Sequence, residues 1–164
     1  MVLKKCWILA ALALILSGCA AKETFETLSD SLAQTAMASP RQTDVRLPDN
    51  AVAPVLESDS EQVYLCEDYE LIIETMSSGD LNATVQSICG YDTEDLTIMQ
   101  TQQGDVKRYD FVWASAGEKG ERLGRAVILD DGSYHYCMSV LRDAEDTEKT
   151  QIVWRNVFNS FALI

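Results

Sequence analysis

Residues 107–142 read KRYDFVWASAGEKGERLGRAVILDDGSYHYCMSVLR, and this stretch decides the fold. Apolar and polar side chains alternate along much of Lys107–Ala116, Glu121–Asp130 and Ser133–Arg142, as they do in half-buried strands. Two groups of turn residues, Gly117–Gly120 and Asp131-Gly132, separate these segments. The stretch therefore predicts three long strands that follow one another as an antiparallel meander.

The turns also predict a register. An Asp-Gly pair favours a two-residue type I′ turn, which would pair Asp130 with Ser133. The four-residue turn before it would pair Ala116 with Glu121. Large aromatic side chains then meet small ones on the next strand, as cross-strand packing prefers. The predicted rows are Trp113 with Gly124 and Ser139, Phe111 with Ala126 and Cys137, and Tyr109 with Ile128 and His135.

The segments upstream of the meander supply further elements. Val63–Cys66 and Tyr69–Met76 predict a hairpin, and Asp95–Thr101 predicts another strand. Ser78–Cys89 has apolar residues at helical spacing. Ser78 or Asp80 is the expected N-cap of this helix, and Gly90 follows it where a left-handed residue is wanted.

A closing helix is predicted over residues 147–163. Its apolar stripe must be buried against the sheet, because an isolated helix of this length is not stable in water. The stripe consists of Trp154, Val157, Phe158 and Phe161. Together the elements predict an α+β fold, with an antiparallel sheet of about five to seven strands flanked by a short middle helix and a C-terminal helix.

The N-terminus carries a different pattern. Lys4 and Lys5 precede an uncharged stretch, Trp7–Leu16, which suits the apolar part of a secretory signal and is too short to span a bilayer. It ends in Leu16-Ser17-Gly18-Cys19, which resembles the lipobox of bacterial lipoproteins. The resemblance implies that Met1–Gly18 is removed and that a diacylglyceryl group is joined to Cys19. An ordinary signal peptide with an incidental Cys19 is the alternative.

Three parts follow from this organisation. Residues 1–18 form the predicted signal peptide, residues 19–41 a lipidated tether with a short helix, and residues 42–164 a single α+β domain. The chain has a formal net charge of −13, which repels nucleic acid and anionic headgroups. We therefore expect a chain that is lipid-anchored on the extracytoplasmic face of the cell membrane and has no nucleic-acid partner.

The order of elements is hairpin, helix, meander and closing helix, and the last of these ends in Trp154–Leu163, WRNVFNSFAL. This arrangement resembles small PsbP-like domains, which are related to the extrinsic proteins of photosystem II and include many bacterial lipoproteins. The segment Asp130–Cys137, DDGSYHYC, is also similar to a group of small lipoproteins from gut-dwelling bacteria. The resemblance carries no catalytic residues and implies an accessory or binding role.

His135 is the only histidine of the chain and its one candidate for catalysis. Ser133 shares its predicted strand face, but residues two apart on a strand lie about 7 Å from each other. A nucleophile and its base must lie within about 3 Å, and the chain contains no GxSxG turn. We therefore predict a packed histidine beside Tyr109, with no catalytic residue and no cofactor.

Acidic residues and cysteines are the chain's other candidate ligands. The acid clusters lack the alternating acids and central glycine of a calcium loop, so no metal site is predicted. They are Glu67-Asp68, Asp130-Asp131 and Asp143-Glu145-Asp146. Three cysteines remain beyond Cys19. They are either buried thiols or one disulfide and a single thiol: Cys66, Cys89 and Cys137.

Tyr134, Tyr136, Met138 and Arg125 fall on the predicted sheet face opposite Trp113. That face is a candidate binding surface for a peptide or glycan if no helix covers it, and a second core layer otherwise. The leading prediction is a lipoprotein that acts as a non-catalytic binding or scaffolding module with a protein or glycan partner. The alternatives are a small cell-surface hydrolase that uses His135 and an accessory subunit of a membrane complex.

Overall fold

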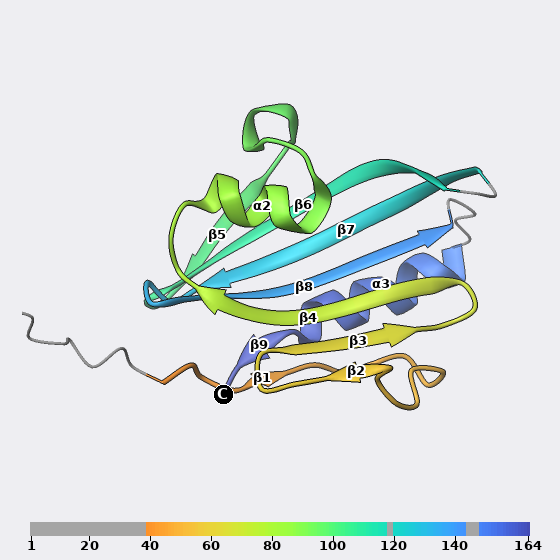
Figure 1. The fold of residues 1–164 in the computed structure, drawn as a ribbon, viewed down its shortest axis with the longest axis horizontal. Helices are drawn as coiled ribbons and strands as arrows, with labels where there is room; N and C mark the ends of the chain where they lie inside the picture. The colour runs from red at the N-terminus through yellow and green to blue at the C-terminus, as the bar shows by residue number, and fades with distance from the viewer. Residues whose placement is uncertain (1–38, 118–119, 144–147) are drawn as a thin grey trace, which may run out of the picture. The chain divides into compact units, whose positions relative to one another are not determined.

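Seven antiparallel strands form the main sheet of the computed structural model, which describes residues 39–117, 120–143 and 148–164 (Figure 1). The order across the sheet is β2–β3–β4–β8–β7–β6–β5. The predicted α+β class with an antiparallel sheet is confirmed. The strands are β2 (Leu56–Glu57), β3 (Glu61–Leu65), β4 (Tyr69–Ser77), β5 (Met99–Gln103), β6 (Val106–Gly117), β7 (Gly120–Asp130) and β8 (Tyr134–Asp143).

Two helices of the described residues pack on opposite faces of this sheet. Helix α2 (Leu81–Cys89) lies on one face and helix α3 (Glu148–Ser160) on the other (Figure 1). A short 3-10 turn, η2 (Thr93–Asp95), follows α2. Strands β1 (Thr43–Asp44) and β9 (Ala162–Leu163) form a separate two-stranded sheet that joins the N-terminal segment to the C-terminus.

The sequence determines both ends of α2. Asp80 is the N-cap, and its Oδ1 atom accepts a hydrogen bond from the Asn82 backbone N–H at 3.0 Å. Gly90 ends the helix with a φ of 78°, which glycine adopts at little cost. The buried side of α2 centres on Val85. It packs on Tyr109, Phe111, Trp113, Ala126, Ile128 and Cys137.

The larger core lies under α3. All four residues of the predicted stripe, Trp154, Val157, Phe158 and Phe161, are buried there. They meet Leu71, Val127, Leu129, Tyr136, Met138 and Val140 of the sheet. The last turn of α3 contains no basic residue, and Arg108 of β6 takes that role by donating hydrogen bonds to the carbonyls of Phe158 and Phe161 at 3.0 and 3.4 Å.

The predicted register is right for one pair of strands and wrong for the other. Between β6 and β7, Trp113 lies opposite Gly124 and Ala116 opposite Glu121, as predicted. Between β7 and β8 the register differs by two residues, so that Asp130 lies opposite His135. The pairs actually formed are Asp130 with His135, Ile128 with Cys137, Ala126 with Ser139 and Gly124 with Leu141.

Side-chain hydrogen bonds in the β7–β8 turn explain this difference. Asp131 Oδ1 accepts from the backbone N–H groups of Ser133 and Tyr134 at 2.9 and 2.8 Å. Asp130 Oδ1 accepts from the Gly132 N–H at 2.8 Å. These carboxylates stabilise a wider turn than an Asp-Gly pair alone requires. Because the shift is an even number of residues, every side chain stays on its predicted face.

Two other boundaries differ from the prediction. Residues 93–95 form η2, and β5 begins at Met99 and extends to Gln103, so the predicted strand Asp95–Thr101 starts too early. Helix α3 ends at Ser160, because the following residues pair with β1. The Ser160 hydroxyl also accepts a hydrogen bond from the Arg46 backbone N–H at 2.8 Å.

Candidate functional site

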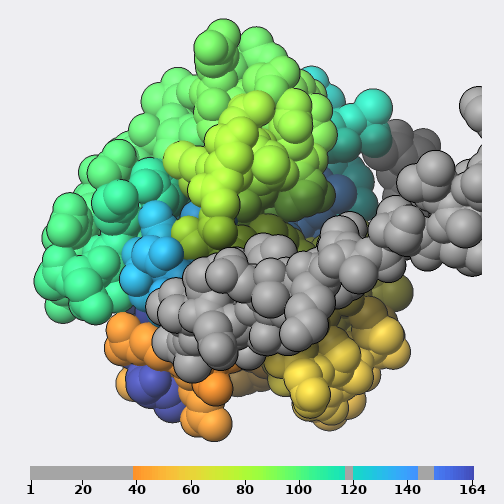
Figure 2. All heavy atoms as spheres, turned by 60° about the vertical axis from the view of Figure 1, so that its left-hand side comes forward, coloured from red at the N-terminus to blue at the C-terminus, as the bar shows by residue number. Residues whose placement is uncertain are grey.

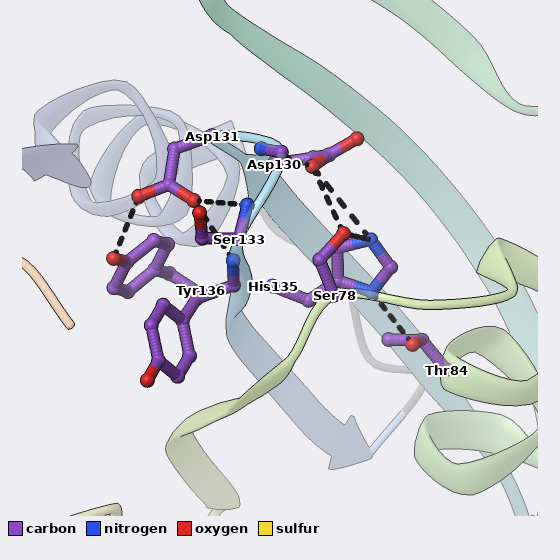
Figure 3. A network of polar contacts seen from close by, with 9 residues as sticks. Ser78, Thr84, Asp130, Asp131, Ser133, His135 and Tyr136 are labelled. Carbon is purple, nitrogen blue, oxygen red and sulfur yellow. Dashed lines mark hydrogen bonds and ion pairs between the residues drawn. The ribbon is translucent and has the colours of Figure 1, made fainter. Parts of the chain in front are cut away.

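His135 is buried at the centre of a partly buried polar cluster on the α2 face of the sheet (Figure 3). Its Nδ1 atom is 2.7 Å from the Thr84 hydroxyl, and its Nε2 atom is 3.5 Å from the Ser78 hydroxyl. The Asp130 carboxylate is 3.9 Å from Nε2 and accepts a hydrogen bond from the Ser78 hydroxyl at 3.4 Å. The fold thus brings together the residue types of a hydrolase site, although the sequence did not predict it.

The geometry differs from that of a nucleophile–histidine–acid relay. In such a relay the hydroxyl and the carboxylate contact different ring nitrogens. Here Ser78 and Asp130 both approach Nε2, and Thr84 takes the other nitrogen. Only 1% of the surface of His135 is exposed, so the ring is not open to a substrate. What the cluster does is join the beginning of α2 to β7 and β8.

Burial also sets the charge of the ring. It lowers the pKa of His135 below the ordinary value of 6.5, and this effect outweighs the carboxylates of Asp130 and Asp131, which raise it. At neutral pH the ring is therefore uncharged, with one nitrogen as donor and the other as acceptor. A neutral ring between two hydroxyls can make both hydrogen bonds without a buried charge.

The predicted β7–β8 register hid this cluster. It placed His135 opposite Ile128, whereas the strands pair His135 with Asp130. The argument against catalysis therefore rests on the burial of His135 and not on the predicted register. The signal that could have revealed the cluster is Thr84, a polar residue beside Val85 on the buried side of α2. A hydroxyl among apolar helix positions needs a buried partner.

A second polar cluster joins the β7–β8 turn to the N-terminal segment. The Tyr136 hydroxyl donates to Asp131 Oδ2 at 2.8 Å and accepts from the Arg41 backbone N–H at 2.8 Å. Burial raises the pKa of Asp131, but backbone hydrogen bonds from Tyr134 and Ser133, together with the bond from Tyr136, hold it below the ordinary 3.8. Arg41, the last residue of the predicted tether, therefore contacts the domain.

Helix α3 covers the face that the sequence offered for binding. Tyr136 and Met138 are completely buried beneath it. The Arg125 guanidinium lies over the Phe158 ring, 4.2 Å from its centroid, and Tyr134 is half-buried beside Tyr136. The condition for a binding surface, an uncovered sheet, is therefore not met, and this face is the second core layer.

An open groove of about 1710 Å³ runs along α3 instead. Its sides are the N-terminal segment 44–50, the outer side of α3, and the strand ends at Tyr69, Gly120 and Arg142. The Tyr69 hydroxyl donates to Asn50 Oδ1 at 2.8 Å and so holds the N-terminal segment in place. The groove is assembled from segments far apart in the sequence, which is why no local pattern predicted it.

Carboxylates outnumber guanidinium groups on the groove wall. The described lining contains Asp44, Asp49, Asp68, Glu121 and Asp143, with Arg46 and Arg142 as its basic residues. Asp143 lies 3.9 Å from the guanidinium of Arg122, whereas the other four acids form no ion pair with a described residue. Val153, which is 38% exposed, adds apolar surface. This wall suits a partner that carries both positive charge and an apolar group.

The other candidates from the sequence are the metal ligands, the three cysteines and the anchor. Among residues 39–117, 120–143 and 148–164, no group of three or more His, Cys, Asp or Glu side chains is placed to hold a metal ion. Cys66, Cys89 and Cys137 are free thiols, and burial raises the pKa of Cys89 and Cys137, which makes both poor nucleophiles. Cys19 and the predicted tether helix lie outside the described residues.

Neither a family nor a membrane-spanning segment is assigned. None of the helices in the described ranges is long and apolar enough to cross a membrane. The chain matches no protein-family model, and no curated protein matches it. The candidate site is therefore defined by geometry alone, as the groove along α3.

Proposed function

We propose that this chain is a lipid-anchored extracytoplasmic module that binds a partner in the groove along α3 and carries out no chemistry of its own. The anchor is supported by Lys4-Lys5, the apolar stretch Trp7–Leu16 and the lipobox-like Leu16–Cys19. A PsbP-like fold is supported by the element order of hairpin, helix, meander and closing helix. The proposed partner is a protein or glycan segment with positive charge.

The observation that carries this proposal is the position of the groove along the strands. The chain enters the domain beside its own C-terminus, where Ile164 N–H donates to the Gln42 carbonyl at 2.9 Å (Figure 1). Arg41 there contacts Tyr136 near the start of β8, whereas Arg142 on the groove wall lies near its end, about 20 Å along the strand. The groove therefore extends to the strand ends that lie away from the point where the N-terminal segment enters the domain.

The two alternatives differ in how well the geometry supports them. A hydrolase based on His135 would need an accessible ring, and this ring is buried. An accessory subunit of a membrane complex would use the same groove, with a permanent partner in place of a transient one. Co-purification from detergent-solubilised membranes at low and high salt separates these two kinds of binding, because a permanent partner stays bound at high salt.

The anchor is tested by the substitution Cys19→Ala. We expect the variant to incorporate no labelled palmitate and to accumulate either as precursor or as a water-soluble product. Labelling equal to that of the unchanged chain would contradict lipidation at Cys19. A Cys66→Ala variant is the matched control and should label normally, because Cys66 lies within the folded domain.

The groove is tested by reversing charge on its wall. The double variant Asp68→Lys/Glu121→Lys should lose the partner recovered from solubilised membranes, since both acids are exposed and face the groove. The control Glu94→Lys/Asp95→Lys makes the same charge change at the exposed turn η2 and should keep the partner. If both variants lost it equally, overall charge and not the groove would govern binding.

A further inference from the structure

The two edge strands of the seven-stranded sheet differ. At one edge, β2 contains only two residues. At the opposite edge, β5 contains five residues, and all of them are exposed, including Met99 at 65%. No strand among the described residues pairs with the outer side of β5 (Figure 1). A row of backbone donors and acceptors is therefore open along this edge.

Strand β5 lacks the features that usually protect an edge. Its sequence, MQTQQ, contains no proline and no charged residue. The adjoining edge of β6, beyond the end of β5, is treated differently, because the Tyr91 hydroxyl donates to the Ala114 carbonyl at 2.9 Å. Strand β5 has no such cover from another described element, and it protrudes with its turn at the left of the view in Figure 2.

Charge identifies the kind of strand that fits this edge. The nine residues Leu96–Gly104 carry no charge, in a chain with 26 acidic and 13 basic residues. A basic partner would find no carboxylate on β5 to bind. Two copies of a chain with a net charge of −13 repel each other over most of their surfaces, but an uncharged edge lets them meet without apposing carboxylates.

The hairpin of β5 and β6 fixes which backbone groups point outward. Gln103 pairs with Val106 across the two-residue turn Gly104-Asp105, and this closing pair is hydrogen-bonded in such hairpins. By the alternation of an antiparallel ladder, the residues Met99, Thr101 and Gln103 direct their N–H and C=O groups toward β6. Gln100 and Gln102 direct theirs outward.

We propose that the outer edge of β5 pairs antiparallel with β5 of a second copy of this chain, with Thr101 on the two-fold axis. In this register, the outward groups of Gln100 meet those of Gln102 in the other copy, so every open group of the strand is used. Thr101 lies opposite Thr101, and threonine pairs are favourable cross-strand neighbours. The junction does not depend on the groove or its partner.

The size of the junction predicts its strength. A five-residue edge buries far less than the roughly 1,200–2,000 Å² of a stable interface, so dimers should be rare in dilute solution. If the chains are held on one membrane, their high local concentration favours the pairing. The pairing is therefore best measured by trapping it covalently.

Cysteine crosslinking of the full chain in membranes tests the register. Thr101→Cys should form a covalent dimer on mild oxidation, because Thr101 faces its own copy across the axis. Gln100→Cys and Gln102→Cys should each crosslink at least fivefold less, and mixing these two variants should restore the crosslink. Ala83→Cys, which is exposed on α2 and outside β5, is the control for random collision. The unchanged chain measures dimers formed through native cysteines.

Three results would overturn the proposal. One is a Thr101→Cys dimer no more abundant than the Ala83→Cys dimer. Another is a Gln100→Cys homodimer as strong as that of Thr101→Cys, which would mean a different axis. The third is a crosslink from position 101 to another protein. A further variant, Gln100→Lys/Gln102→Lys in the Thr101→Cys background, should reduce the dimer, and its circular dichroism shows whether it still folds.

Discussion

His135 has no access to solvent, yet its protonation is linked to the stability of the fold. Its pKa in the folded protein lies below the value of about 6.5 expected for the unfolded chain. Below that pH the unfolded chain therefore binds a proton more readily than the folded one. The free energy of unfolding falls as the pH decreases through this value, and the fall ends once the pH is below the folded-state pKa.

We expect the protein to lose stability from about pH 7.5 to pH 5.5, and the His135→Gln variant to lose less over the same interval. Burial, together with the charge of Glu61, raises the pKa of Glu74 and has the opposite effect, but it acts equally in both proteins and cancels in the difference. Urea unfolding at each pH measures the free energy of unfolding of both proteins. At about pH 7.5 the variant should be less stable by ~1 kcal/mol, and equal pH slopes would contradict the linkage.

Gly124 is required by its neighbour across the strands. A Cβ atom at this position would overlap the Trp113 ring, whereas one at Gly79 would have no neighbour within 4 Å. We expect Gly124→Ala to destabilise the domain by about 1–3 kcal/mol, the range for overpacked cores. Gly79→Ala should change stability by less than about 0.5 kcal/mol. Thermal unfolding of both variants decides whether the Trp113 ring can move aside at small cost.

These residues show what the sequence could reveal and what it could not. The pairing of Trp113 with Gly124 was predictable, because it follows once the turn Gly117–Gly120 pairs Ala116 with Glu121. The pairing of Asp130 with His135 was not, because it depends on the hydrogen bonds of the Asp131 side chain. A rule based on residue type treats Asp-Gly as a two-residue turn. It does not consider the backbone N–H groups that donate hydrogen bonds to the aspartate carboxylate.

At the scale of elements, the position of α3 was more predictable than its end. The apolar stripe from Trp154 to Phe161 appears in the sequence and is buried on the sheet. Ser160 ends the helix because its hydroxyl bonds to Arg46 and because β9 pairs with β1, and both partners lie more than a hundred residues upstream. Such long-range contacts leave no local signal.

The docking of α3 is tested by truncating one residue of its stripe. Phe158 is 1% exposed and lies under the Arg125 guanidinium. Phe158→Ala should lower the free energy of unfolding by about 3–5 kcal/mol, as expected for a buried aromatic residue. Ile152→Ala on the same helix is the control, because Ile152 is 48% exposed. Similar losses for both variants would mean that α3 contributes through helix propensity and not through packing.

At the scale of the whole domain, the groove and the N-terminal segment belong together. The sequence predicted a domain beginning at residue 42 and said nothing of a groove. In the structure, residues 44–50 form one side of it, Tyr69 and Ser160 hold that side in place, and Val45 and Leu47 pack against the larger core. These contacts join segments that no periodicity connects.

The N-terminal segment is therefore expected to stabilise the domain, and truncation measures by how much. A chain of residues 42–164 loses the bond from Arg41 N–H to the Tyr136 hydroxyl, which should lower stability by about 0.5–1.5 kcal/mol relative to residues 39–164. A chain of residues 52–164 also loses β1, the burial of Val45 and Leu47, and the bond of Asn50 to Tyr69. That loss should be about 3–6 kcal/mol.

Urea unfolding of the three chains gives the comparison, and Tyr69→Phe in residues 39–164 isolates the Asn50 bond at about 1 kcal/mol. The longest truncation should also affect partner binding. Because residues 44–50 form one side of the groove, residues 52–164 should also fail to bind the partner that residues 39–164 recover. Binding that survived this truncation would place the partner elsewhere on the domain, even if the stability loss were as large as expected.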